Sequence, residues 1–173
     1  MDELIFAAEK DIEEESKEES WKVIIADDEA DIHEMTQLVF NDYQFLGRPI
    51  EFLSAYTGEE TYSLFKKHSD IAIVLLDVMM EDSDAGLKVV GIIRNEMKNL
   101  FTRIILRTGQ PGYAPEDEVI FKYDINDYIN KADTNSRKII TSVTTALRSY
   151  RDIKTIESYR ATLEEKVQGK TGF

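Results

Sequence analysis

Apolar residues gather in five short stretches, separated by longer segments of mixed polarity. The stretches are rich in β-branched and aromatic residues and have the length of strands. They span residues 21–26, 50–56, 71–76 and 103–107, with a shorter fifth stretch within 124–130. The first and third stop abruptly at aspartates. The third is apolar throughout and the first is apolar except for Lys22, which predicts buried strands.

The segments between these stretches carry apolar residues every three or four positions, which predicts amphipathic helices. Helices are expected at residues 31–40, from residue 58 onward with Thr57 and Glu60 as a capping box, at 86–97, after Pro115, and from about 133 to 167. In the first of these, Ile32, Met35, Leu38 and Val39 form the apolar stripe. Five alternations of strand and helix predict an α/β fold, with a doubly wound five-stranded parallel sheet and right-handed crossovers.

Composition limits the class of protein. The chain has 173 residues, 42% of them apolar, which suits one domain with an extension. It has no cysteine, so disulfides and thiolate metal sites are excluded. The net charge of −13 makes nucleic acid and anionic membranes poor direct partners. The apolar run 71–76 is too short to cross a bilayer, and acids stand where a signal peptide has basic residues. A cytoplasmic location is expected.

The two ends of the chain differ from its middle. Residues 1–20 hold nine acids against two lysines, a net charge of −7, and are expected to be a solvated extension. Residues 21–150 form the predicted domain. Residues 151–173 continue the last helix beyond the length that one domain needs, and apolar residues still recur along it: Ile153, Ile156, Tyr159, Leu163 and Val167. This stripe predicts a linker or dimerisation helix of the coiled-coil type.

Chemically active side chains follow the predicted strands. The first strand ends in Asp27 and Asp28, the third in Asp77 and the fourth in Thr108, while Lys131 closely follows the fifth. The carboxyl ends of parallel strands meet at one edge of the sheet, so these side chains are expected to converge. Three carboxylates at close range repel one another unless a cation joins them, and Mg²⁺ prefers such oxygen ligands.

A phosphoryl group suits this set of residues. Mg²⁺ and Lys131 would supply positive charge, and the Thr108 hydroxyl can donate to a phosphoryl oxygen. Asp77 ends the most buried strand and is the expected nucleophile, because a carboxylate can form an aspartyl phosphate.

The pattern resembles the receiver domain of response regulators, the CheY-like family of two-component systems. The resemblance rests on Asp27-Asp28, Asp77, Thr108, Tyr128 and Lys131, and it covers roughly residues 21–150. It implies a flavodoxin-like sheet with strand order 2-1-3-4-5. It also implies that Asp77 accepts a phosphoryl group from a histidine kinase or phosphotransfer protein. Such a domain is not an enzyme beyond its own phosphorylation and dephosphorylation.

The resemblance further assigns roles to single residues. Asp28, Asp77 and the Met79 backbone carbonyl would ligate Mg²⁺, with Asp27 acting through water. Thr108 and Lys131 would hold the phosphoryl group, and Tyr128 would be the aromatic switch. Regulators with a long last helix often carry a cyclic-dinucleotide or HD-type output domain, which would lie outside this chain.

The sequence departs from the family at three positions. Glu81 stands where the family usually has proline, Gly86 lies one position later than the usual glycine, and Ala132 replaces the proline after the lysine. The loop after Asp77 is therefore longer and more acidic, and a cis bond after Lys131 is not expected.

Two other functions are considered, one that uses similar residues and one that occurs on the same fold. A haloacid-dehalogenase-like phosphatase also has a strand-end aspartate and Mg²⁺, but it needs a second acid two positions later, where this chain has Met79. A flavin- or nucleotide-binding module would have a loop rich in glycine or hydroxyl residues after the first strand, where this chain has acids. His33 and His68 have no partner at metal-ligand spacing and are expected on helix surfaces.

Overall fold

A largely parallel sheet forms the centre of the domain. The computed structural model describes residues 19–109, 115–133 and 135–171, and within these ranges six strands form one sheet in the order β2-β3-β1-β4-β5-β6. The strands are β1 (Trp21–Ala26), β2 (Gln44–Phe45), β3 (Arg48–Ala55), β4 (Ile71–Asp77), β5 (Arg103–Thr108) and β6 (Asp127–Asn130). The predicted parallel sheet is confirmed, since its order 2-1-3-4-5 corresponds to β3-β1-β4-β5-β6.

The two-residue strand β2 was not predicted. It pairs antiparallel with β3 through a tight turn at Leu46 and Gly47, both of which have positive φ, as a type I′ hairpin turn requires. The indole of Trp21 donates a hydrogen bond of 3.0 Å to the Phe45 carbonyl, which fixes β2 to the start of β1. A strand of two residues is too short to give a hydrophobic alternation.

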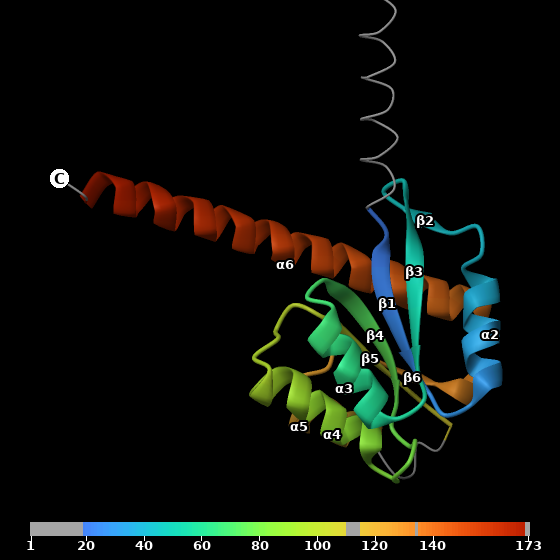
Figure 1. Cartoon of the computed structure of the whole chain (residues 1–173). Helices are drawn as coiled ribbons and strands as arrows, with labels where there is room; N and C mark the ends of the chain where they lie inside the picture. The colour runs from blue at the N-terminus through green and yellow to red at the C-terminus, as the bar shows by residue number, and fades with distance from the viewer. Residues whose placement is uncertain (1–18, 110–114, 134, 172–173) are drawn as a thin grey trace, which may run out of the picture.

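Helices cover both faces of the sheet, which gives three layers (Figure 1). The helical elements are α2 (Ala30–Val39), α3 (Gly58–Lys67), α4 (Ala85–Gly91) with the π-helical turn η1 (Ile92–Glu96), α5 (Glu116–Lys122), the 3₁₀ turn η2 (Lys131–Asp133) and α6 (Ser136–Thr171). Helices α3, α4 and α5 pack on one face, and α2 and α6 on the other. The predicted Thr57 cap is confirmed, because its side chain accepts a hydrogen bond from the Glu60 amide.

The inner face of α2 differs from the prediction. Met35 and Leu38, assigned to its apolar stripe, are 62% and 74% exposed, whereas His33 and Thr36 are buried. The surface location predicted for His33 is therefore wrong. Compared with the prediction, α2 is rotated about its axis. Its inner face meets polar groups at the sheet edge, and His33 and Thr36 hydrogen-bond to them.

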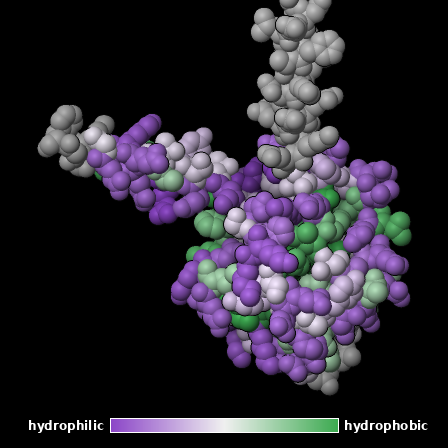
Figure 2. All heavy atoms as spheres, in the orientation of Figure 1, coloured by the Kyte–Doolittle hydropathy of each residue, from purple (hydrophilic) through white to green (hydrophobic). Residues whose placement is uncertain are grey.

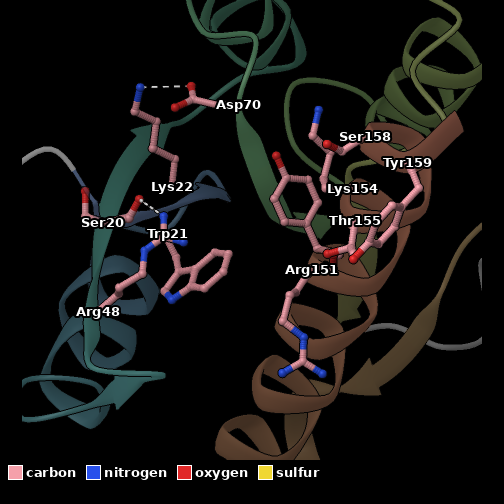
Figure 3. A pocket seen from close by; sticks show the side chains of 11 residues that line it. Ser20, Trp21, Lys22, Arg48, Asp70, Arg151, Lys154, Thr155, Ser158 and Tyr159 are labelled. Carbon is pink, nitrogen blue, oxygen red and sulfur yellow. Dashed lines mark hydrogen bonds and ion pairs between the residues drawn. The ribbon is translucent and has the colours of Figure 1, made fainter. Parts of the chain in front are cut away.

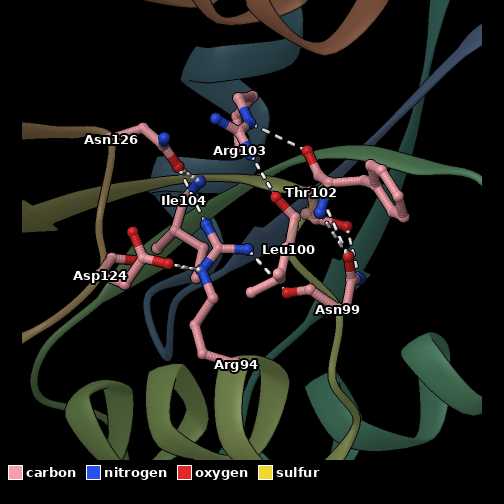
Figure 4. A network of polar contacts seen from close by, with 9 residues as sticks. Arg94, Asn99, Leu100, Thr102, Arg103, Ile104, Asp124 and Asn126 are labelled. Carbon is pink, nitrogen blue, oxygen red and sulfur yellow. Dashed lines mark hydrogen bonds and ion pairs between the residues drawn. The ribbon is translucent and has the colours of Figure 1, made fainter. Parts of the chain in front are cut away.

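A polar network closes the amino-terminal edge of β5 and β6 (Figure 4). The Arg94 guanidinium donates to the carbonyls of Asp124 and Asn99 and to the Asn126 side chain, and its Nε lies 3.3 Å from the Asp124 carboxylate. Arg94 belongs to η1, where the helix predicted at 86–97 widens into a π turn. The network joins this turn to the strand starts.

Helix α6 begins on the sheet and continues past it (Figure 1). Its first half is buried through Val143, Leu147 and Tyr150. Arg151 and Lys154 then line a hollow of about 540 Å³ beside the start of β1, where Lys22 pairs with Asp70 at 2.9 Å (Figure 3). From residue 158 the described helix is exposed. Figure 2 shows the projecting part as largely hydrophilic on the face in view.

Some predicted segments lie outside the described residues. They are positions 1–18 of the acidic extension and positions 110–114 of the loop after β5. Among the described residues, no helix has both the length and the apolar character needed to cross a membrane.

Candidate functional site

Three aspartates converge at the carboxyl edge of the sheet, as predicted. Asp27 and Asp28 follow β1, and Asp77 is the last residue of β4, the neighbouring strand. One carboxylate oxygen from each lies within 4.8 Å of the other two. Asp77 is 5% exposed and Asp27 is buried, while Asp28 faces solvent. The sheet therefore forms an acidic cluster with one open side.

Lys131 brings the cluster its closest positive charge. Its ammonium lies 2.7 Å from Asp27 Oδ2 and 2.9 Å from Asp77 Oδ2, so it bridges the two buried carboxylates. Burial acts to lower the pKa of Lys131, but the hydrogen bonds to Asp27 and Asp77 outweigh it and raise the pKa. The lysine therefore stays charged.

One ammonium does not neutralise three carboxylates. Burial raises the pKa of Asp77 to about 6, although Lys131 acts in the opposite direction. Burial and the neighbouring Asp27 also raise the pKa of Asp28. The excess of negative charge and the all-oxygen donor set fit a hard divalent cation. An acidic triad of this kind is typical of the Mg²⁺ site of receiver domains.

The structure also places the other predicted site residues. Thr108 ends β5 and is buried, one residue beyond Arg107, which pairs in register with Asp77. Tyr128 lies on β6, and its side chain is buried in the core on the α5 face. The Met79 amide donates a hydrogen bond of 3.3 Å to Asp77 Oδ1. The ligand role of the Met79 carbonyl stays a prediction.

The unusual loop after Asp77 has a structural explanation. The Glu81 carboxylate accepts hydrogen bonds of 2.9 and 3.0 Å from the Gly58 amide, at the positive end of α3. Gly86 packs directly on the strand, and a Cβ there would lie 2.0 Å from the Asp77 carbonyl oxygen. Glu81 thus ties the loop to α3, and Gly86 lets α4 start against the acceptor strand. The described residues contain no cis peptide bond, so the bond between Lys131 and Ala132 is trans.

Three polar residues near the site were missed. His33 Nε2 lies 2.8 Å from the Asp27 carbonyl oxygen, and its Nδ1 lies 2.9 Å from the Ser54 hydroxyl. One turn later, the Thr36 hydroxyl accepts a 2.9 Å hydrogen bond from buried Arg107. His33 and Thr36 are three positions apart, the spacing of one helix face, which is the signal that could have placed them together.

The comparisons with known proteins place the chain in a family. A model of the response regulator receiver domain matches residues 23–144, and the chain belongs to this family. It is similar to the 3'3'-cGAMP-specific phosphodiesterase 2 of Vibrio cholerae, with 39% identity over 94% of this chain and 31% of that protein. The chain thus spans about a third of the length of that relative.

Solved structures of receiver domains are also similar. A signal receiver domain of a two-component histidine kinase from Clostridium thermocellum has a TM-score of 0.61 and 25% identity over 73% of this chain and 97% of its own. The response regulator TrrA of Thermotoga maritima, in complex with Mg²⁺–BeF, has a TM-score of 0.59 and 25% identity over 73% of this chain and 99% of its own.

Proposed function

We propose that Asp77 accepts a phosphoryl group from a histidine kinase or phosphotransfer protein, in a reaction that depends on Mg²⁺. The observation that carries this proposal is the position of the Asp77 carboxylate. It is buried at a strand end, shares a cluster with two other carboxylates and lies 2.9 Å from Lys131. Mg²⁺ would neutralise the excess negative charge of this cluster and so allow an anionic phosphoryl group to approach Asp77.

Each residue has a defined part in the transfer. A carboxylate oxygen of Asp77 attacks the phosphorus of the donor, the bond from phosphorus to the donor nitrogen breaks, and the imidazole leaves. Lys131 neutralises the phosphoryl oxygens, and the Thr108 hydroxyl donates a hydrogen bond to one of them. Asp28, Asp77 and the Met79 carbonyl would hold Mg²⁺, with Asp27 acting through water. The metal, when bound, supplies charge neutralisation at the phosphoryl group.

The alternative phosphatase function has less support. A dehalogenase-like phosphatase needs an acid two residues after its nucleophile, and that position is Met79. Tyr128 serves the signalling function instead, as the aromatic switch that reports the state of Thr108.

Titration with beryllium fluoride tests the acceptor role. Calorimetry in saturating Mg²⁺ should detect binding to the parent chain and none to Asp77→Asn. Asp82→Asn is the matched control, because Asp82 is an exposed acid in the same loop. Equal binding to the parent and Asp77→Asn would refute the proposal.

The second part of the proposal divides the chain into three parts. They are an acidic extension at 1–20, a receiver domain at 21–150 and a distal helix at 151–173.

The distal helix carries exposed apolar side chains. Four of them are 60% or more exposed, namely Ile156, Tyr159, Leu163 and Val167. They form a stripe suited to a parallel two-helix contact between copies of the chain. The helix would connect the domain to an output activity outside this chain. The relative in Vibrio cholerae makes hydrolysis of a cyclic dinucleotide the first activity to examine.

Light scattering tests the dimer. The parent chain should dimerise with rising concentration, and Leu163→Glu should remain monomeric. Glu164→Gln controls for the change of charge on the exposed helix. A parent chain that stays monomeric with and without beryllium fluoride would contradict the dimer.

A further inference from the structure

Arg107 is a buried cation that the phosphoryl chemistry above does not use. It is 7% exposed and lies on β5 directly before Thr108. Its backbone pairs in register with Asp77 on β4, so the two residues are side-by-side neighbours in the sheet. Paired residues of parallel strands point to the same face, which here is the face covered by α2 and α6.

The contacts of Arg107 do not explain its burial. Its Nη1 donates to the Thr36 hydroxyl at 2.9 Å, and Thr36 in turn donates to the Ile32 carbonyl. Its Nε is buried and has no hydrogen-bond partner among the described residues. No carboxylate within those residues forms an ion pair with it. A guanidinium with one neutral partner is expensive to bury unless charges nearby compensate it.

The nearby charges are the acidic cluster itself. Asp77 is flanked by Arg107 on the next strand and by Lys131, which reaches it from the end of β6. Burial lowers the pKa of Arg107, whereas Asp27 and Asp77 act to raise it. Arg107 and Lys131 also line one small cavity of about 110 Å³ between α2 and the start of α6. Arg107 is thus a second cation beneath the same carboxylates.

We propose that Arg107 is a charge-balancing residue of the acidic site, which weakens Mg²⁺ binding at rest and strengthens retention of the phosphoryl group. This inference rests on the proposed function. The signs follow from Coulomb's law, because a fixed positive charge repels an incoming divalent cation and attracts the anion that arrives afterwards. Thr36 holds the guanidinium in place from α2.

The decisive variants separate charge from packing. Arg107→Met removes the charge and keeps an unbranched side chain, and Arg107→Lys keeps the charge. Thr36→Val removes the hydrogen bond that holds the guanidinium. Arg107→Gln is a second neutral variant for use if Arg107→Met does not fold. Calorimetry measures the Mg²⁺ affinity first, and then the beryllium fluoride affinity in saturating Mg²⁺, at low and high salt.

The two affinities should change in opposite directions. We expect Arg107→Met to bind Mg²⁺ about three- to tenfold more tightly and beryllium fluoride more weakly by a similar factor, with both effects smaller at high salt. Arg107→Lys should stay close to the parent, and Thr36→Val should lie between. A purely structural role would move both affinities in the same direction or neither.

Two results would overturn the inference. One is a neutral variant whose Mg²⁺ affinity matches that of the parent within twofold, and the other is Arg107→Lys behaving like Arg107→Met. The Asp77→Asn control is measured first. If it leaves binding of beryllium fluoride unchanged, the proposed function fails, and the role of Arg107 fails with it.

Discussion

Arg94 and Arg107 are two buried arginines at opposite ends of the sheet. They are 6% and 7% exposed, so burial alone does not distinguish them. All three nitrogen positions of the Arg94 guanidinium reach acceptors, and Asp124 balances its charge (Figure 4). The Arg107 guanidinium has a single hydroxyl partner, Thr36, and among the described residues its buried Nε has no partner.

The difference separates two uses of a buried charge. At the amino-terminal edge, the Arg94 guanidinium is fully paired, and its network joins η1 to the strand starts. At the carboxyl edge, carboxylates are gathered without enough cations to balance them. An arrangement that is poor for stability there leaves room for a metal and a phosphoryl group, so it is explained by function.

The largest effect on stability is expected at the acidic end, from Gly86→Ala. The new Cβ would lie 2.0 Å from the Asp77 carbonyl oxygen and 2.9 Å from the Val78 Cα, both of them backbone atoms. We expect a loss of about 3 kcal/mol, at the upper end for overpacking. Gly91→Ala is the control, because nothing lies within 4 Å of its Cβ. Urea unfolding measures both, and equal stabilities would show that α4 can shift without penalty.

Arg94→Met should be the next most damaging change. It removes the Arg94 donor from the carbonyls of Asp124 and Asn99 and the cation that pairs with the Asp124 carboxylate, and we expect a loss of about 2–3 kcal/mol in urea unfolding. Mg²⁺ affinity should stay at the parent value, since the network lies at the far edge of the sheet. Arg94→Met therefore contrasts with Arg107→Met. A change in the Mg²⁺ affinity of Arg94→Met would contradict the assignment of a purely structural role to the amino-terminal edge.

Asp77→Asn should increase stability in the absence of divalent metal. The folded-state pKa of Asp77 is raised from 3.8 to about 6, so its charged form opposes folding above pH 6 and this penalty disappears as the pH falls towards 4. We expect a gain of roughly 2 kcal/mol at pH 7.5 and a smaller gain near pH 5. Thermal unfolding at both pH values measures it, and a gain independent of pH would assign the effect to packing.

The smallest expected effect is the pH dependence of Mg²⁺ affinity, because protons and Mg²⁺ compete for the carboxylates of the acidic cluster. Because a ligand must be deprotonated to bind metal, Mg²⁺ affinity should fall below pH 6, by at most about tenfold per pH unit for one displaced proton. Calorimetric titrations between pH 5 and 8 test this dependence. A flat profile would show that Asp77 is already ionised throughout this range.

The sequence predicted the strands and the carboxylate cluster because both depend on local patterns. Buried strands show as apolar runs, and the residues that end them must meet at one edge of a parallel sheet. It predicted the phase of α2 wrongly, since Met35 and Leu38 are exposed while His33 and Thr36 face inward. His33 bonds to a backbone carbonyl, that of Asp27, which no side-chain pattern indicates. Thr36 bonds to Arg107, which is far away in the sequence. The tie between Glu81 and Gly58 was missed for the same reason.

Mapping of a phosphorylated residue tests the central claim most directly. The chain is incubated with Mg²⁺ and a small phosphodonor, the acyl phosphate is reduced with borohydride, and the modified peptide is identified by mass spectrometry. We predict one modified residue, Asp77, with full modification in Asp82→Asn and none in Asp77→Asn. Modification at another residue, or equal labelling of Asp77→Asn, would contradict the assignment of Asp77 as the phosphoryl acceptor.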